Sequence, residues 1–201
     1  MALLLVTSIG FVAINLDRWI AAQSLEKLRF SSYAFAWTLL MVGQALQVVV
    51  NASVFPFLAR TFAASGIRAS YGVALRLSCV LLLLGAIMFG PSALVGKYAI
   101  ANWFPTYKDA TPLVSIFVFV AAIRLADFWS SFLVIAGRER LLVGLNVLAV
   151  VVSLLVWSLY ARPWAVSSMD LWDIGVLAAL LSTFNYLLSA AASLRVYALR
   201  S

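Results

Sequence analysis

The sequence predicts an all-α, polytopic membrane protein folded as a single bundle of six transmembrane helices. Of the 201 residues, 65% are apolar and only 10% are charged, against roughly 45–50% and about 25% in soluble domains. A membrane-spanning helix needs about 20 mainly apolar residues, so six spans use most of the chain and leave short connections. We therefore expect one transmembrane domain, residues 1–201, in contact with the lipid bilayer.

The first apolar run covers residues 1–22 and lacks the basic segment and cleavage site of a signal peptide. Asn15, Asp17 and Arg18 interrupt it, and the uninterrupted stretch 1–14 is short for a complete span, which suggests truncation. The other apolar runs define five further segments. The predicted helices are 1–22, 33–58, 72–95, 111–136, 141–160 and 171–197.

Local signals set the ends of the second and third helices. Ser31 or Ser32 is a plausible N-cap of the second helix, and Pro56 lies near its end. Gly90-Pro91 is expected to kink or fray the end of the third, because proline removes a backbone hydrogen bond. Residues 97–110 are then the longest loop, a turn at the membrane interface.

Capping signals mark the remaining helices. Thr111-Pro112 predicts a helix start, with threonine as the N-cap and proline in the first turn. Gly137 opens a tight charged turn into the fifth helix, and Asp170 and Asp173 are expected to cap the sixth.

Charge and cysteine content exclude several classes of function. The net charge is +7, but the basic residues lie singly at helix ends and loops, which favours a topological role over nucleic-acid binding. Cys79 is the only cysteine and histidine is absent, so an internal disulfide and a Cys/His metal site are excluded. No catalytic motif occurs, and we expect neither an enzyme nor a cofactor.

The basic residues also predict an orientation. An N-terminus in the cytoplasm places seven of them on the cytoplasmic side and five, including Arg162, on the other. Because cytoplasmic loops carry the excess of Lys and Arg, both termini are expected in the cytoplasm.

Two groups of charged residues fall inside predicted spans, where an ionisable side chain is expected to face protein or a cavity. Arg124 and Asp127 are three residues apart on one helix face, as either a structural ion pair or an arginine lining a cavity for an anionic group. Asp17 and Arg18 are adjacent, so they point about 100° apart and do not face one partner alike. They are either a pair near the interface or part of a polar site.

Two predicted helices carry polar faces. Trp37, Gln44, Gln47 and Asn51 share a face of the second helix, and the sixth repeats the pattern. Such residues either join helix to helix or form the wall of a substrate path. The sixth-helix residues are Ser182, Asn185, Ser189 and Ser193.

Several short motifs resemble one known family, the lipid-linked oligosaccharide flippases of the polysaccharide exporter family, within the multidrug and oligosaccharidyl-lipid exporter superfamily. The second half of those proteins opens with a helix bearing an Asp-Arg pair, followed by one that starts at a tyrosine and ends at a proline. The matching segments are Asn15-Leu16-Asp17-Arg18, residues 33–38 (YAFAWT), Val54-Phe55-Pro56 with Ala59-Arg60, and residues 107–110 with the turn at Gly137.

The resemblance implies one lobe of a two-lobed transporter in a bacterial inner membrane. Such proteins move a lipid pyrophosphate-linked oligosaccharide by alternating access, and this chain matches the second lobe only, so a partner lobe or a second copy is expected. Arg18 and Arg124 would meet the diphosphate, and Asp17 and Asp127 would hold the guanidiniums or exchange protons. The expected cavity-facing residues are Arg18, Arg124, Asp17, Asp127, Gln44, Gln47, Asn51 and Asn185.

Two other functions are consistent with the same sequence. One is a multidrug or ion-coupled exporter lobe, in which the carboxylates matter more than the arginines. The other is a membrane assembly protein that transports nothing.

Overall fold

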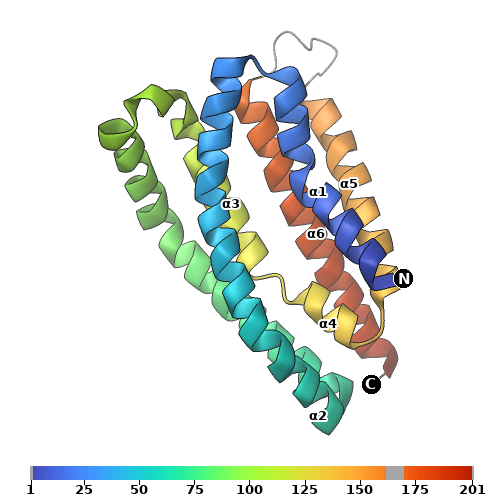
Figure 1. Cartoon of the computed structure of the whole chain (residues 1–201). Coiled ribbons are helices and arrows are strands. Elements are labelled where there is room, and N and C mark those ends of the chain that lie inside the picture. Colours follow the sequence, from blue (N-terminus) through green and yellow to red (C-terminus); the bar gives the residue numbers. More distant parts are fainter. Residues whose placement is uncertain (1, 162–169, 201) are drawn as a thin grey trace.

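The structure, a computed structural model, describes residues 2–161 and 170–200 (Figure 1). Every regular element in these residues is a helix, which confirms the all-α prediction. Arg162, which entered the charge count, lies outside the described residues. The elements are α1 (Ala2–Ser24), α2 (Lys27–Trp103), the 3-10 helix η1 (Pro105–Ala110), α3 (Thr111–Leu125), α4 (Trp129–Ile135), α5 (Glu139–Ala161) and α6 (Leu171–Arg200).

Four helical segments in the described part are long and apolar enough to cross a membrane. This supports the prediction of a membrane protein. A bundle of six separate spanning helices is not confirmed: the second and third predicted helices are joined at Gly66 with no loop between them, and the fourth is divided between α3 and α4. The four segments are Lys27–Trp103, Pro105–Ile135, Glu139–Leu159 and Leu171–Leu199.

Helix α2 is a 77-residue hairpin with one non-helical residue, Gly66 (φ 77°, ψ −172°). This backbone region is essentially restricted to glycine. We call residues 27–65 the first arm and residues 67–103 the second arm. The predicted limits 33–58 and 72–95 were too short, because the flanking segments are rich in alanine and arginine, which favour helix.

The helix ends predicted within α2 were largely wrong. The helix begins at Lys27, and the Ser31 hydroxyl donates to the Leu28 carbonyl oxygen inside the first turn instead of capping the helix. Pro56 and Pro91 both lie inside the helix, and the second arm continues helically to Trp103. The predicted loop 97–110 is therefore the last helical turns of α2 followed by η1.

Aromatic rings join the two ends of α2 at one end of the molecule. Phe35, in the first arm, stacks on Tyr107 of η1 with ring centroids 4.4 Å apart. It also contacts Phe104, directly after the second arm, at 5.1 Å. The arms therefore run antiparallel, and the tip of the hairpin lies at the opposite end of α2 (Figure 1).

Helix α3 packs between the two arms and α6. Glycines allow the close approach: a Cβ at Gly43 would lie 2.8 Å from the Ala121 Cβ, and one at Gly85 would lie 2.7 Å from the Ala122 Cβ. The predicted start of α3 is confirmed to within one residue, since Thr111 is its first residue and Pro112 lies in its first turn.

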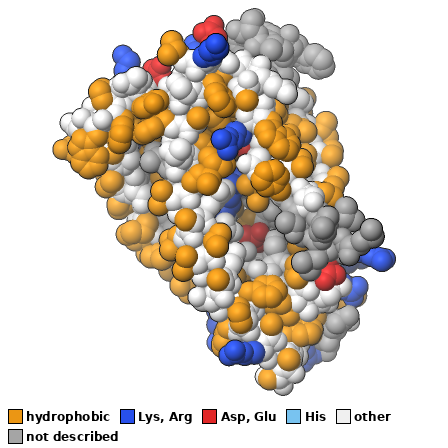
Figure 2. Space-filling model, in the orientation of Figure 1, with side chains coloured by type: hydrophobic (Ala, Val, Ile, Leu, Met, Phe, Trp, Pro, Cys, Tyr) orange, Lys and Arg blue, Asp and Glu red, His pale blue; other side chains and the backbone are white. Residues whose placement is uncertain are grey.

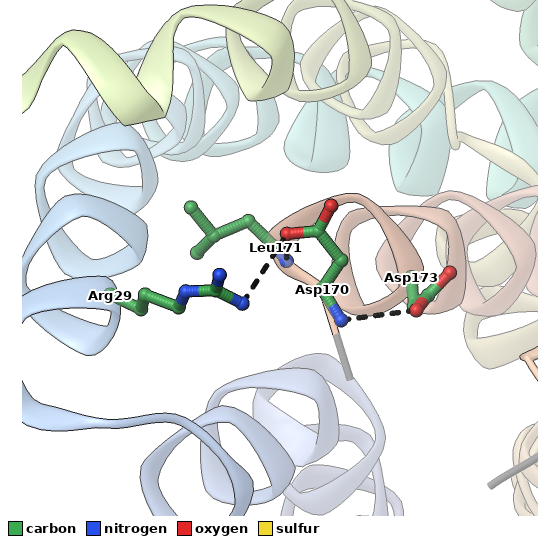
Figure 3. Close-up of polar contacts among 4 residues, drawn as sticks. All are labelled: Arg29, Asp170, Leu171 and Asp173. Carbon is green, nitrogen blue, oxygen red and sulfur yellow. Dashed lines mark hydrogen bonds and ion pairs between the residues drawn. The ribbon is translucent and has the colours of Figure 1, made fainter. Parts of the chain in front are cut away.

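The turn before α5 and the cap of α6 are found where they were predicted, although α5 begins two residues earlier than expected, at Glu139. Gly137 adopts a positive φ of 69° two residues before α5. At α6, the Asp170 carboxylate accepts from the Leu171 amide at 2.8 Å, and the Asp173 carboxylate accepts from the Asp170 amide at 3.1 Å (Figure 3). Arg29 of the first arm lies 3.8 Å from the same Asp170 carboxylate.

Charged side chains gather at the two ends of the molecule, with a small group in a hollow midway between them (Figure 2). One end contains the tip of the α2 hairpin, the turn before α5 and the end of α6; the other contains the α1–α2 turn, η1 and the start of α6 (Figure 1). The turns that were predicted to carry the basic residues therefore lie at the two ends of the molecule (Figure 1).

Candidate functional site

A polar cavity of about 260 Å³ lies in the middle of the helical bundle. Residues from α1, the first arm of α2, α3, α5 and α6 form its walls, together with the segment that follows α3. Ala13, Ile14, Val48, Ala149 and Val150 contribute apolar surface. The polar residues that line it are Gln44, Gln47, Arg124, Asp127, Ser182 and Asn185.

The cavity lies at a break between α3 and α4, where one helix, 111–136, was predicted. Residues 126–128 leave the helical hydrogen-bond pattern although they include no proline or glycine. Asp127 explains part of this break. Its carboxylate accepts from the Ser130 amide at 3.3 Å and from the Ser130 hydroxyl at 2.8 Å, at the start of α4. An aspartate that bonds the backbone in this way competes with helix continuation.

Side chains of other helices satisfy the carbonyl groups at the break. The Gln47 amide donates to the Arg124 carbonyl oxygen at 2.7 Å, and the Ser78 hydroxyl lies 2.7 Å from the Ala126 carbonyl oxygen. Ser78 also lies 2.7 Å from the hydroxyl of Tyr186 on α6. A broken helix inside a membrane requires this support, since no water replaces the lost backbone bonds.

Arg124 is buried, with 9% of its surface exposed. Its Nε donates to the Ser182 hydroxyl at 3.0 Å, while its Nη1 is buried without a hydrogen-bond partner in the described part of the chain. Asp17 interacts with it electrostatically. The cavity thus contains a guanidinium with unused donor capacity.

The ion pair between Arg124 and Asp127, one of the two interpretations of these residues, is not observed. Both residues line the cavity, but among the described residues they form no ion pair. The break at residues 126–128 removes the helical geometry on which the i, i+3 argument depended. Asp127 instead binds Ser130.

Asp17 lies near the cavity but not in its wall. It is fully buried, and its Oδ2 accepts a hydrogen bond from the hydroxyl of Tyr33. Its Oδ1 has no hydrogen-bond partner in the described residues. Tyr33 is also fully buried and packs edge-on against Phe117, with centroids 5.7 Å apart.

Arg18 turns away from Asp17, as the helical geometry predicted. Its guanidinium carbon lies 4.6 Å from the ring centroid of Trp37, a cation–π contact. It is exposed and is not among the residues that line the cavity. Its predicted cavity-facing position is therefore not observed.

The two polar helix faces each divide between the cavity and helix packing. Gln44 and Gln47 line the cavity, whereas Asn51, one turn further, does not. On α6, Ser182 and Asn185 line it, and the Asn185 Oδ1 is buried without a described partner. Ser189 and Ser193 are buried away from it, and Ser193 lies 3.5 Å from the Trp129 carbonyl oxygen.

Tyr33 is the residue that sequence reasoning missed as the partner of Asp17. The two lie about equally far from the α1–α2 turn, so they face each other when the helices run antiparallel. That symmetry about the turn was readable from the sequence.

No protein-family model matches the chain, and neither the curated proteins nor the solved structures give a significant match.

Proposed function

We propose that this chain is a membrane transport protein of the flippase type, whose polar cavity receives an anionic group such as the diphosphate of a lipid-linked oligosaccharide. The observation that carries the proposal is Arg124, a buried guanidinium that lines a cavity with its Nη1 unpartnered among the described residues. A planar guanidinium binds phosphate oxygens in pairs. Ser182 holds its Nε, which fixes the orientation of the group.

The proposed topology has six crossings: α1, each arm of α2, α3 with α4, α5 and α6. Charge supports an orientation with both termini in a bacterial cytoplasm. At the hairpin-tip end, the described residues include six arginines and one acidic residue, whereas the other end has four basic and four acidic residues. The arginines are Arg60, Arg68, Arg76, Arg138, Arg140 and Arg195, and the acidic residue is Glu139.

Pairing with a second lobe is part of the proposal. Helix α1 packs on α5 and α6 and has few contacts with α2, and Figure 2 shows charged atoms in a hollow of this face. Transporters of this general kind bind substrate between two bundles. A separate lobe or a second copy of this chain would provide the opposite wall.

The first experiment measures binding of a polyprenyl diphosphate to the purified chain in phosphatidylcholine nanodiscs. Arg124→Gln is expected to weaken binding at least about tenfold, because hydrogen bonds to charged groups contribute about 1.5–3 kcal/mol. Arg29→Gln, which removes an exposed arginine at one end, is the control. Unchanged affinity in a folded Arg124→Gln variant would overturn the proposal.

A second experiment, an ion-coupled export assay, separates the exporter alternative, which the unpartnered Oδ1 of Asp17 favours. That alternative expects Asp17→Asn to abolish ion-coupled export while Arg124→Gln retains it. Flipping assays in liposomes, with oligomeric state measured in parallel, test the pairing. Robust flipping by a demonstrated monomer would contradict it.

A further inference from the structure

A second hollow, unrelated to the polar cavity, lies between the arms of α2. Its volume is about 600 Å³. Helix α3 forms the floor, and it is visible between the arms in Figure 1. The walls include Val42 and Leu46 of the first arm and Leu84, Met88 and Val95 of the second. We call this hollow the α2 groove.

Small residues hollow out the α2 groove. Gly43 faces Ala121, Gly85 faces Ala122, and a Cβ at Gly96 would lie 2.7 Å from Val114. The arms therefore approach the floor closely at these glycines. The larger wall residues beside them are exposed.

We do not expect ordered water in the α2 groove. Ser92 is the one polar side chain among the described residues that line it. A bound water needs two to four polar partners, and apolar cavities stay dry.

The dimensions favour a flexible chain over a helix. The floor from Val114 to Leu125 extends about 16 Å along α3. Dividing the volume by this length gives a mean cross-section of about 40 Å². A helix with its side chains is about 10–12 Å wide and needs roughly twice that section, so it would fill the groove only in part.

We infer that the α2 groove binds the acyl chain of a bilayer phospholipid. The groove lies in segments apolar enough to cross a membrane, where hydrocarbon is the surrounding solvent. An acyl chain fills an irregular apolar hollow without leaving polar groups unpaired. This site does not depend on the function proposed for the polar cavity.

The test uses the full chain, one copy per nanodisc, in phosphatidylcholine that carries a diazirine in the acyl chain. Illumination releases N₂, and the resulting carbene inserts into neighbouring bonds of the protein. Peptide mass spectrometry is expected to find labels on Val118 and Ala121 several-fold above those on Leu155, an exposed residue of α5. Equal labelling of floor and α5 would overturn the inference.

Matched variants sharpen the result. Val95→Trp fills the groove and should reduce floor labelling to the Leu155 level, while its neighbour Leu94→Trp should leave it unchanged. Val95 is 67% and Leu94 70% exposed, and only Val95 lines the groove. Leu46→Trp fills it from the other wall and is expected to repeat the effect.

Floor labelling that persists in both filling variants would overturn the inference. So would protection of the floor in discs that hold two copies, because a second copy would then be the occupant.

Discussion

Two interruptions of helix in this protein arise from opposite causes. At Gly66, one residue reverses the chain through its own backbone conformation, and no other group lies within 4 Å of the position its Cβ would take. At residues 126–128, by contrast, neither glycine nor proline is present, and side chains from both arms of α2 satisfy the carbonyl groups. The first interruption is local and the second depends on the tertiary fold.

The largest effect is expected from removing the tertiary support. In Gln47→Leu combined with Ser78→Ala, two carbonyl groups lose their side-chain donors and keep only the amides of Asp127 and Phe128. Each lost hydrogen bond costs about 0.5–1.5 kcal/mol, so we expect the free energy of unfolding in detergent to fall by about 1–3 kcal/mol. Thr38→Val with Ser53→Ala, two exposed positions of the first arm, is the control. A loss no larger than the control's would mean that the break needs no support.

The local interruption should be sensitive to a single methyl group. Gly66→Ala places a side chain at φ 77°, ψ −172°, a conformation that costs about 1–3 kcal/mol for other residues. Gly72→Ala, also without a neighbour within 4 Å of its Cβ, is the control. Equal stability of the two variants would show that the hairpin reverses without strain.

A third comparison separates glycines needed for conformation from those needed for packing. Gly85→Ala would bring two Cβ atoms to 2.7 Å, and overpacking of this kind costs about 1–3 kcal/mol. Gly72→Ala meets no neighbour and should stabilise by about 0.5–1 kcal/mol through helix propensity. Thermal unfolding in detergent measures both. A similar shift for the two would contradict the close packing of α2 on α3.

The smallest effect concerns Arg124 and Asp127. Because they form no ion pair in the described structure, a double-mutant cycle of Arg124→Gln and Asp127→Asn should give a smaller coupling energy than directly bonded residues, which couple by about 0.5–3 kcal/mol. The Arg124→Gln and Ser182→Ala cycle is the reference, since those side chains bond at 3.0 Å. A coupling larger than the reference would support the structural ion pair, one of the two interpretations of the sequence.

Hydropathy and capping predicted the helical class, the start of α3, the turn before α5 and the cap of α6, because these signals are local. They ended the two helices of α2 too early, at residues 58 and 95, since Pro56 and Pro91 were placed near helix ends, whereas both lie inside the arms. The break after Leu125 was missed because its support comes from Gln47 and Ser78, distant in sequence.

Local and long-range effects can also be distinguished in the predicted cavity residues. Five of the eight predicted cavity residues line one cavity, because the helical periodicity that placed them together survives in the fold. Arg18 and Asn51 do not, and Asp17 lies behind the wall. The five are Gln44, Gln47, Arg124, Asp127 and Asn185.

The aromatic contacts of Phe35 with Phe104 and Tyr107 have a mechanical consequence. They tie the two ends of α2 together, so force applied to the chain termini reaches these rings before it reaches most of either arm. Once that tie opens, both arms lose their common anchor and should leave the bundle in one step. In a pulling experiment, extraction of this 77-residue helix would lengthen the tether by about 250–280 Å, as a single event instead of two.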